Sequence, residues 1–201
     1  MLTHFWLLSV GAAALAPRQD RRGALHRFAA AATALIAPRA YAKPPPTLQG
    51  AYASFNAGRY DEALTAFEAL TATDANDATA WEGKGTVELI LGSQKATLGV
   101  APTGTALELC ERAVASLQKS AALSDDALTL NNLGNAQAVL LKWGDAAESY
   151  QKSLDAALAS KRDRGLASIP ASNRAQVAVE LGDLKDAARR TENLLRRDPN
   201  F

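Results

Sequence analysis

The stretch that decides the fold is KWGDAAESYQKSL, residues 142–154, because its phrase occurs three times along the chain. The other two copies are GRYDEALTAFEAL, residues 58–70, and LGDLKDAARRTENLL, residues 181–195. Each copy has a turn bearing Gly or Asp and then an alanine in the same phase, namely Ala63, Ala146 or Ala187. In two of the copies an aromatic follows four residues later, as Phe67 and Tyr150. Self-similarity at a fixed period indicates a stacked array rather than a single globule.

The segments upstream of these copies agree with an array. AWEGKGTVELILG (residues 80–92) and LTLNNLGNAQAVLLK (residues 128–142) each place an apolar or aromatic residue shortly before a glycine. Together the segments resemble tetratricopeptide repeats, whose signature is W-x₂-L-G-x₂-Y…A-x₃-F…P over about 34 residues. The best match runs over residues 127–160, with Leu133 and Gly134 in its first helix and Ala146 and Tyr150 in its second.

The resemblance also has departures. Gln137 stands where the first helix usually has an aromatic, and Ser124-Asp125-Asp126 stands where a Pro-containing turn is common. In the last copy Ala187 is followed by Thr191 instead of an aromatic.

The resemblance covers about residues 47–201 and implies an all-α fold. We expect a TPR-like α-solenoid of about four helix-turn-helix repeats, preceded by a targeting segment. The repeats fall at about residues 47–77, 78–126, 127–160 and 168–201, with a loop at residues 93–105 inside the second. The alternative is a plain helical bundle with alanine-rich packing. Phased small-then-aromatic spacing favours the array.

Residues 1–42 have the composition of a targeting presequence. Residues 1–16 carry an uncharged apolar run, FWLLSVGAAALA, which is too short to cross a bilayer and resembles a secretory signal. Residues 18–42 combine the pair Arg21-Arg22, the apolar stretch FAAAATALIA and a final Ala40-Tyr41-Ala42. These features are typical of a twin-arginine export signal with an A-x-A cleavage site.

Two export signals in tandem resemble the layered targeting of thylakoid-lumen proteins in algae with a secondary plastid. The resemblance implies a plastid, thylakoid-lumen location. Two alternatives stay open. The chain is a bacterial twin-arginine precursor with an over-extended start, which would place it in the periplasm, or residues 1–42 form a genuine helix hairpin.

The charge balance argues against a nucleic-acid partner. The chain has 22 basic and 21 acidic residues, and residues 1–42 hold five Arg and one Asp, which leaves 17 basic and 20 acidic residues beyond them. A nucleic-acid binder normally shows a basic stripe. The last segment is the exception, with a basic tail patch at Arg189, Arg190, Arg196 and Arg197. That patch is either a solvated face or a docking surface.

Residues for catalysis are scarce. His4 and His26 are the only histidines and both lie in the targeting region, and Cys110 is the only cysteine. Histidine-based relays, histidine-based metal sites and disulfides are therefore absent from the segment after residue 42. The GKGT stretch at residues 83–86 lacks the spacing of a phosphate-binding loop. We expect no enzyme, no metal and no cofactor.

The resemblance implies that the first helix of each repeat lines a concave groove that binds a peptide or protein. The groove candidates from this mapping are Tyr52, Phe55, Asn56, Thr86, Leu89, Ile90, Asn131, Asn135, Ala138, Gln176, Val179 and Glu180. Asparagine amides can hydrogen-bond a peptide backbone, and apolar groups can hold anchor side chains. The alternative for each residue is packing against the next repeat. The Lys/Arg clamp that some relatives use to hold chaperone C-termini is absent.

The sequence therefore predicts a protein-interaction scaffold. Resemblance to plastid tetratricopeptide proteins implies a role in assembling or maintaining a photosynthetic complex, and the alternatives are an enzyme subunit or a periplasmic bacterial TPR adaptor. Leu184, Leu194 and Leu195 predict an uncovered apolar stripe at the last helix. We expect that the natural protein continues past Phe201, or that this end docks on a partner or a second copy.

Overall fold

The fold of the chain is all-α, as the sequence predicts. The computed structural model describes residues 46–97, 99–160 and 164–197, so the expectations about the targeting segment fall outside it. The described residues form eight α-helices and one short 3₁₀ turn, Arg164–Leu166. The helices are α1 (Leu48–Asn56), α2 (Tyr60–Thr73), α3 (Ala78–Lys95), α4 (Gly104–Leu123), α5 (Ala127–Val139), α6 (Trp143–Ala159), α7 (Ser168–Glu180) and α8 (Leu184–Arg197).

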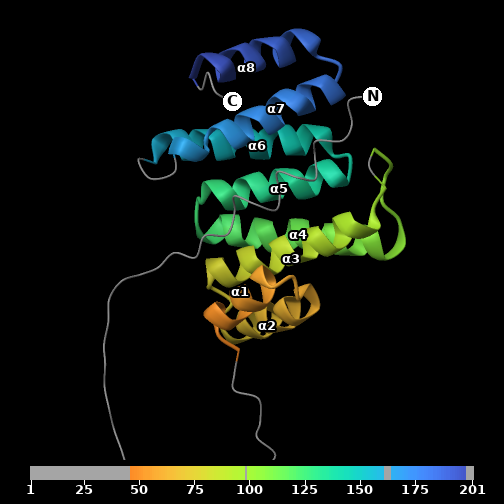
Figure 1. The fold of residues 1–201 in the computed structure, drawn as a ribbon, viewed down its shortest axis with the longest axis vertical. Coiled ribbons are helices and arrows are strands. Elements are labelled where there is room, and N and C mark those ends of the chain that lie inside the picture. Colours follow the sequence, from red (N-terminus) through yellow and green to blue (C-terminus); the bar gives the residue numbers. More distant parts are fainter. Residues whose placement is uncertain (1–45, 98, 161–163, 198–201) are drawn as a thin grey trace, which may run out of the picture.

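The helices form four antiparallel pairs that stack in chain order, from α1 and α2 at one end to α8 at the other (Figure 1). Each helix packs against its neighbours in sequence. In addition, α1 contacts α3, α3 contacts α5 and α5 contacts α7, whereas among the described residues the second helices of successive pairs do not pack against one another. The stack is therefore tighter on the side of the first helices. That side is the inner, concave face of the solenoid.

Side chains that connect the pairs differ in length between the two faces. On the side of the second helices, long arginines reach across: Arg112 of α4 pairs with Glu68 of α2, and Arg190 of α8 donates a hydrogen bond to Gln151 of α6 at 3.2 Å. On the side of the first helices, short amides and hydroxyls are long enough, as described below. This difference follows from the wider separation of the second helices.

Small residues let the paired helices approach closely. A Cβ on Gly134 of α5 would lie 2.5 Å from Tyr150 of α6, and a Cβ on Gly85 of α3 would lie 2.6 Å from Leu117 of α4. Ala146 is fully buried beside Tyr150 in the same core cluster. The small-then-large phrase therefore describes the contact between the helices of a pair. Contacts as short as these leave no room for a methyl group.

The connection between α3 and α4 covers residues 96–103, so part of the loop expected at residues 93–105 is helical. The sequence argument treated Gly92 as the end of the helix. In the structure Gly92 is buried inside α3, where a Cβ would lie 2.7 Å from the Cys110 sulfur. Gly92 therefore serves close packing rather than chain termination. Cys110 is fully buried, and burial raises the pKa of its thiol to about 11.

Turns and caps explain where the helices begin and end. Asp77 and Asp126 accept hydrogen bonds from the first backbone N–H groups of α3 and α5. The turns inside three of the pairs each place one residue in the left-handed region, namely Gly58 (φ 73°), Leu141 (φ 57°) and Gly182 (φ 76°). Leu141 is notable because a side chain in this region costs about 1–2 kcal/mol.

Candidate partner-binding surface

Side-chain hydrogen bonds join successive first helices along the concave face. Between α1 and α3, the Tyr52 hydroxyl donates to a Glu82 carboxylate oxygen at 3.4 Å. Between α3 and α5, the Asn132 amide donates to the Thr86 hydroxyl at 3.3 Å. The concave face is thus built mainly from short polar groups.

The most elaborate of these joints lies between α5 and α7, and we call it the α5–α7 seam: Asn131, Asn135 and Asn173. The amide nitrogen of Asn173 donates to the side-chain oxygen of Asn131 at 2.9 Å and to that of Asn135 at 3.4 Å. The hydroxyl of Tyr150, in α6, donates to the same Asn135 oxygen at 2.8 Å. Burial raises the pKa of Tyr150 far above its ordinary value, so this phenol stays protonated and keeps its donor.

The sequence-predicted groove residues lie in three kinds of environment. Four are buried: Phe55, Thr86, Asn131 and Asn135. Tyr52 and Gln176 are half-buried, and Asn56 and Glu180 are exposed. Among the apolar candidates, Leu89 and Ala138 are buried, Ile90 is half-buried, and Val179 is 45% exposed. The polar candidates therefore lie on the first helices, but most of their surface contacts other helices. Their contact with a partner stays a prediction.

Sequence reasoning missed Asn132, Asn173 and Glu82. Asn132 and Asn173 stand 41 residues apart, the same separation as Ala146 and Ala187, so they occupy the same position in successive repeats. An alignment of the repeats by their phase would have paired them. No comparable signal marks Glu82, because its bond depends on Tyr52 of another repeat.

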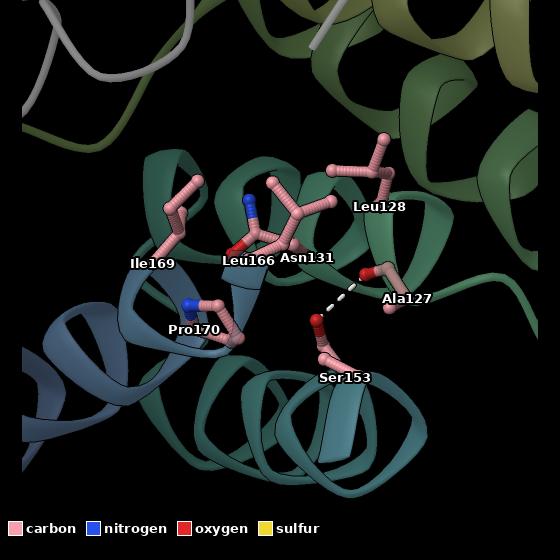
Figure 2. Close-up of a pocket in the computed structure, with 8 residues that line it drawn as sticks. Ala127, Leu128, Asn131, Ser153, Leu166, Ile169 and Pro170 are labelled. Atoms are coloured by element: carbon pink, nitrogen blue, oxygen red, sulfur yellow. Dashed lines mark hydrogen bonds between the residues drawn. The ribbon is translucent and has the colours of Figure 1, made fainter. Parts of the chain in front are cut away.

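A shallow hollow lies beside the α5–α7 seam (Figure 2). It encloses about 180 Å³, part of it open solvent, and is lined by Ala127, Leu128, Asn131, Ser153, Ala157, Leu166, Ile169 and Pro170. Its base is held by the Ser153 hydroxyl, which donates to the Ala127 carbonyl at 2.6 Å. Pockets for small-molecule ligands have volumes of about 300–1,000 Å³, so this hollow suits one side chain rather than a metabolite.

A buried ionic cluster lies away from this face, between α2, α3 and α4. Glu88 of α3 is fully buried, accepts a 2.7 Å hydrogen bond from the Ser116 hydroxyl, and pairs with Arg112 at 2.8 Å. Burial raises the pKa of Glu88, and the hydrogen bond from Ser116 and the charges of Lys84 and Arg112 oppose this rise. Every oxygen of the carboxylate has a partner, so the cluster connects helices and offers no open acid or base.

The basic tail does not form one exposed patch. Arg189 and Arg196 are exposed and pair with Asp186 and Glu192. Arg190 instead turns inward, with 23% of its side chain exposed, and bonds Asp186 and Gln151. Of the Arg197 side chain the structure describes nothing. Docking of a partner on these arginines stays a prediction.

Two further searches of the described residues found nothing. No group of three or more His, Cys, Asp or Glu side chains in that part of the chain is placed to hold a metal ion. Among the described helices, none has the length and apolar content needed to cross a bilayer.

Solved structures that are similar to this one are repeat proteins. MamA from Desulfovibrio magneticus RS-1 superposes with a TM-score of 0.60 at 21% identity, over 77% of this chain and 76% of MamA. TTC0263, described as a thermophilic TPR protein of Thermus thermophilus, gives 0.59 at 17% identity, over 76% of this chain and 73% of its own. This chain has the TPR fold.

A third similar structure contains a bound peptide. PcrH, solved in complex with the chaperone binding region of PopD, superposes with a TM-score of 0.56 at 20% identity, over 66% of this chain and 90% of PcrH. By sequence, no family model and no curated protein matches the chain. The likeness is therefore one of fold, and it confirms the TPR-like solenoid expected from the repeated phrase.

Proposed function

We propose that this chain is a protein-interaction scaffold that binds a segment of a partner protein along its concave TPR face. The observation that carries the proposal is the row of hydrogen-bonding groups on successive first helices, which ends in the α5–α7 seam. Amide groups recognise the polypeptide backbone, which every protein partner has. The PcrH complex supports the proposal, because a protein of the same fold holds a peptide.

Site-specific photo-cross-linking tests this proposal. A photoreactive residue at Gln176, half-buried on α7 and one turn beyond Asn173, should capture a partner in the native compartment. The control is the same residue at Glu111, which is exposed on α4, a second helix. A partner captured from Glu111 and never from Gln176 would place binding on the convex face and reject the proposal.

We further propose that the chain works in the thylakoid lumen of a plastid, where it assists assembly or maintenance of a photosynthetic complex. The support is the succession of two export-like segments in residues 1–42 with Arg21-Arg22 before the second. The bacterial periplasm is the alternative location. Self-association through the C-terminal end belongs to the same proposal.

Processing tests the location. The mature protein should begin at or near Lys43, and changing Arg21 and Arg22 to Lys should stop the final translocation, because the twin-arginine pathway reads that pair. Mass spectrometry of the native protein decides the point. Peptides from residues 2–39 in the purified mature protein would contradict the proposed processing.

A further inference from the structure

The α5–α7 seam leaves two hydrogen-bond donors unused. An asparagine amide has one oxygen and one NH₂ group. The oxygens of Asn131 and Asn135 both accept from Asn173, which orients the two amides so that their NH₂ groups point elsewhere. Neither NH₂ group donates to a described residue. Among the described residues only Arg174 has a fully buried side-chain nitrogen without a partner, so both NH₂ groups reach the surface.

The spacing of these donors matches an extended polypeptide. Asn131 and Asn135 are four residues apart on α5, which corresponds to about 6 Å along the helix at a rise of about 1.5 Å per residue. In an extended chain, residues two apart face the same way and are separated by about 6.5 Å. Carbonyl groups at every second residue of an extended partner can therefore accept from both amides.

The hollow beside the seam adds a requirement for the partner's side chain. Asn131 belongs both to the seam and to the hollow wall, and Figure 2 shows its amide nitrogen on the same side as Leu166 and Ile169. Most of the other lining groups are apolar, and the space is below the size of a small-molecule site. A small aliphatic side chain fits these walls better than an aromatic or a charged one.

Other joints of the concave face do not offer this combination. The Asn132 amide at the α3–α5 joint is consumed by the bond to Thr86. The α1–α3 joint uses the Tyr52 hydroxyl and a carboxylate, which repels carbonyl oxygens. The α5–α7 seam is the part of the described concave face where free amide donors and an apolar recess occur together.

Building on the function proposed above, we propose that the α5–α7 seam binds an extended stretch of partner polypeptide: two carbonyls, two residues apart, accept from Asn131 and Asn135, and a small aliphatic side chain enters the hollow between Leu166 and Ile169. The seam would thus set both the register and the side-chain preference of the bound segment. The partner is recognised mainly by its backbone, with one position read by size.

A random heptapeptide display library, selected on the full chain, supplies the probe. Selected peptides should be enriched in a small aliphatic residue at one position, and synthetic copies allow titration. Asn131→Asp keeps the oxygen that Asn173 needs and removes the N–H donors, so we expect binding to weaken about 3- to 10-fold, the effect of one hydrogen bond. Ile169→Trp fills the hollow and should weaken binding at least as much.

Gln176→Glu is the matched control, because it introduces the same charge on the same face outside the seam. Replacing the enriched peptide residue by Trp gives a second readout that does not depend on how Ile169→Trp folds. If no peptide is selected at all, the proposed scaffold function fails. If peptides bind but Asn131→Asp and the Trp-substituted peptide bind like the originals, the function stands and the seam proposal is overturned.

Discussion

At the scale of single residues, the third helix pair depends on a glycine that lies under an aromatic ring. Gly134 is buried in α5, and a Cβ there would lie 2.5 Å from the ring of Tyr150, itself fully buried. Tyr150 is fixed from the other end by its hydroxyl bond to Asn135, so the ring has no room to withdraw. The close approach therefore requires glycine despite its cost in a helix.

We predict that Gly134→Ala lowers the free energy of unfolding by about 1–3 kcal/mol, because the added methyl group overpacks the contact with Tyr150. Urea unfolding followed by circular dichroism measures it. Gly144→Ala is the control, since nothing lies within 4 Å of a Cβ at that position in α6. There alanine's better helix propensity should stabilise by up to about 1 kcal/mol. Equal effects at both positions would contradict the assigned packing.

Glu88 predicts a pH dependence of stability. Burial raises the pKa of Glu88 in the folded protein above its ordinary 4.5. As the pH rises from that value through the raised folded pKa, the unfolded chain has already lost the proton that the folded chain still holds. The free energy of unfolding therefore falls with rising pH in this window.

The difference in unfolding free energy between the parent and Glu88→Gln should reproduce this fall, because glutamine does not titrate. Urea unfolding at a series of pH values measures it. Glu148→Gln is the control, since Lys152 lowers the pKa of the exposed Glu148 and gives it the opposite direction. A pH-independent difference for Glu88→Gln would mean that Arg112 keeps the buried carboxylate ionised throughout.

At the scale of elements, the fourth helix pair differs from the third. Ala175 and Thr191 occupy the positions that Gly134 and Tyr150 hold one repeat earlier, 41 residues upstream. In place of an aromatic under which a glycine lies, the contact between α7 and α8 contains Asp186 with Arg174 and Arg190 around it. The last pair is therefore held by polar groups, and α8 packs only against α7 among the described helices.

We predict that Asp186→Asn loosens α8 before any other helix. The change leaves Arg174 and Arg190 facing each other without a carboxylate, at a cost of about 1–3 kcal/mol, less than for a fully buried pair. Hydrogen exchange should speed up in α8 while α3 to α6 keep their protection. Glu192→Gln, whose partner Arg196 is exposed, should change little.

Acid should have the same effect as this substitution. Hydrogen bonds from Arg190 and Arg189 lower the pKa of Asp186 below its ordinary 3.8. Its stabilisation is therefore present above that value and is lost as the pH falls through the folded pKa. If Asp186→Asn instead accelerates exchange throughout the solenoid, α8 is not an independent unit.

At the scale of the whole molecule, the sequence predicted the architecture because the repeat phase is written in local spacing. Ala146 and Tyr150 identify the contact between paired helices without any knowledge of the superhelix. The joints between pairs were not predictable in the same way. Whether Asn131 faces a partner or Asn173 depends on how far one pair is rotated against the next, which no local pattern encodes. Gly92 shows a second limit, because a glycine for packing and a glycine for termination look alike in sequence.

The open end of the stack leads to the last prediction. Three apolar side chains gather around the turn between α7 and α8: Val179, Leu181 and Leu184 are 45%, 53% and 67% exposed. Of the three leucines expected to form an uncovered stripe, Leu184 is thus exposed, while the side chains of Leu194 and Leu195 lie outside the described part. Exposed apolar patches mark interaction sites when they are contiguous.

We predict that the purified chain self-associates through this end and that Leu184→Asp shifts it toward monomer, because a carboxylate at the contact must lose its water. Sedimentation velocity over a range of concentrations measures the shift. Val100→Asp is the matched control, since Val100 is 56% exposed in the connection between α3 and α4, away from the end. If the end meets its own copy, association stops at dimers, whereas contact with a different surface of the next copy gives larger species. A parent chain that stays monomeric at every concentration would show that this end needs no cover from a second copy.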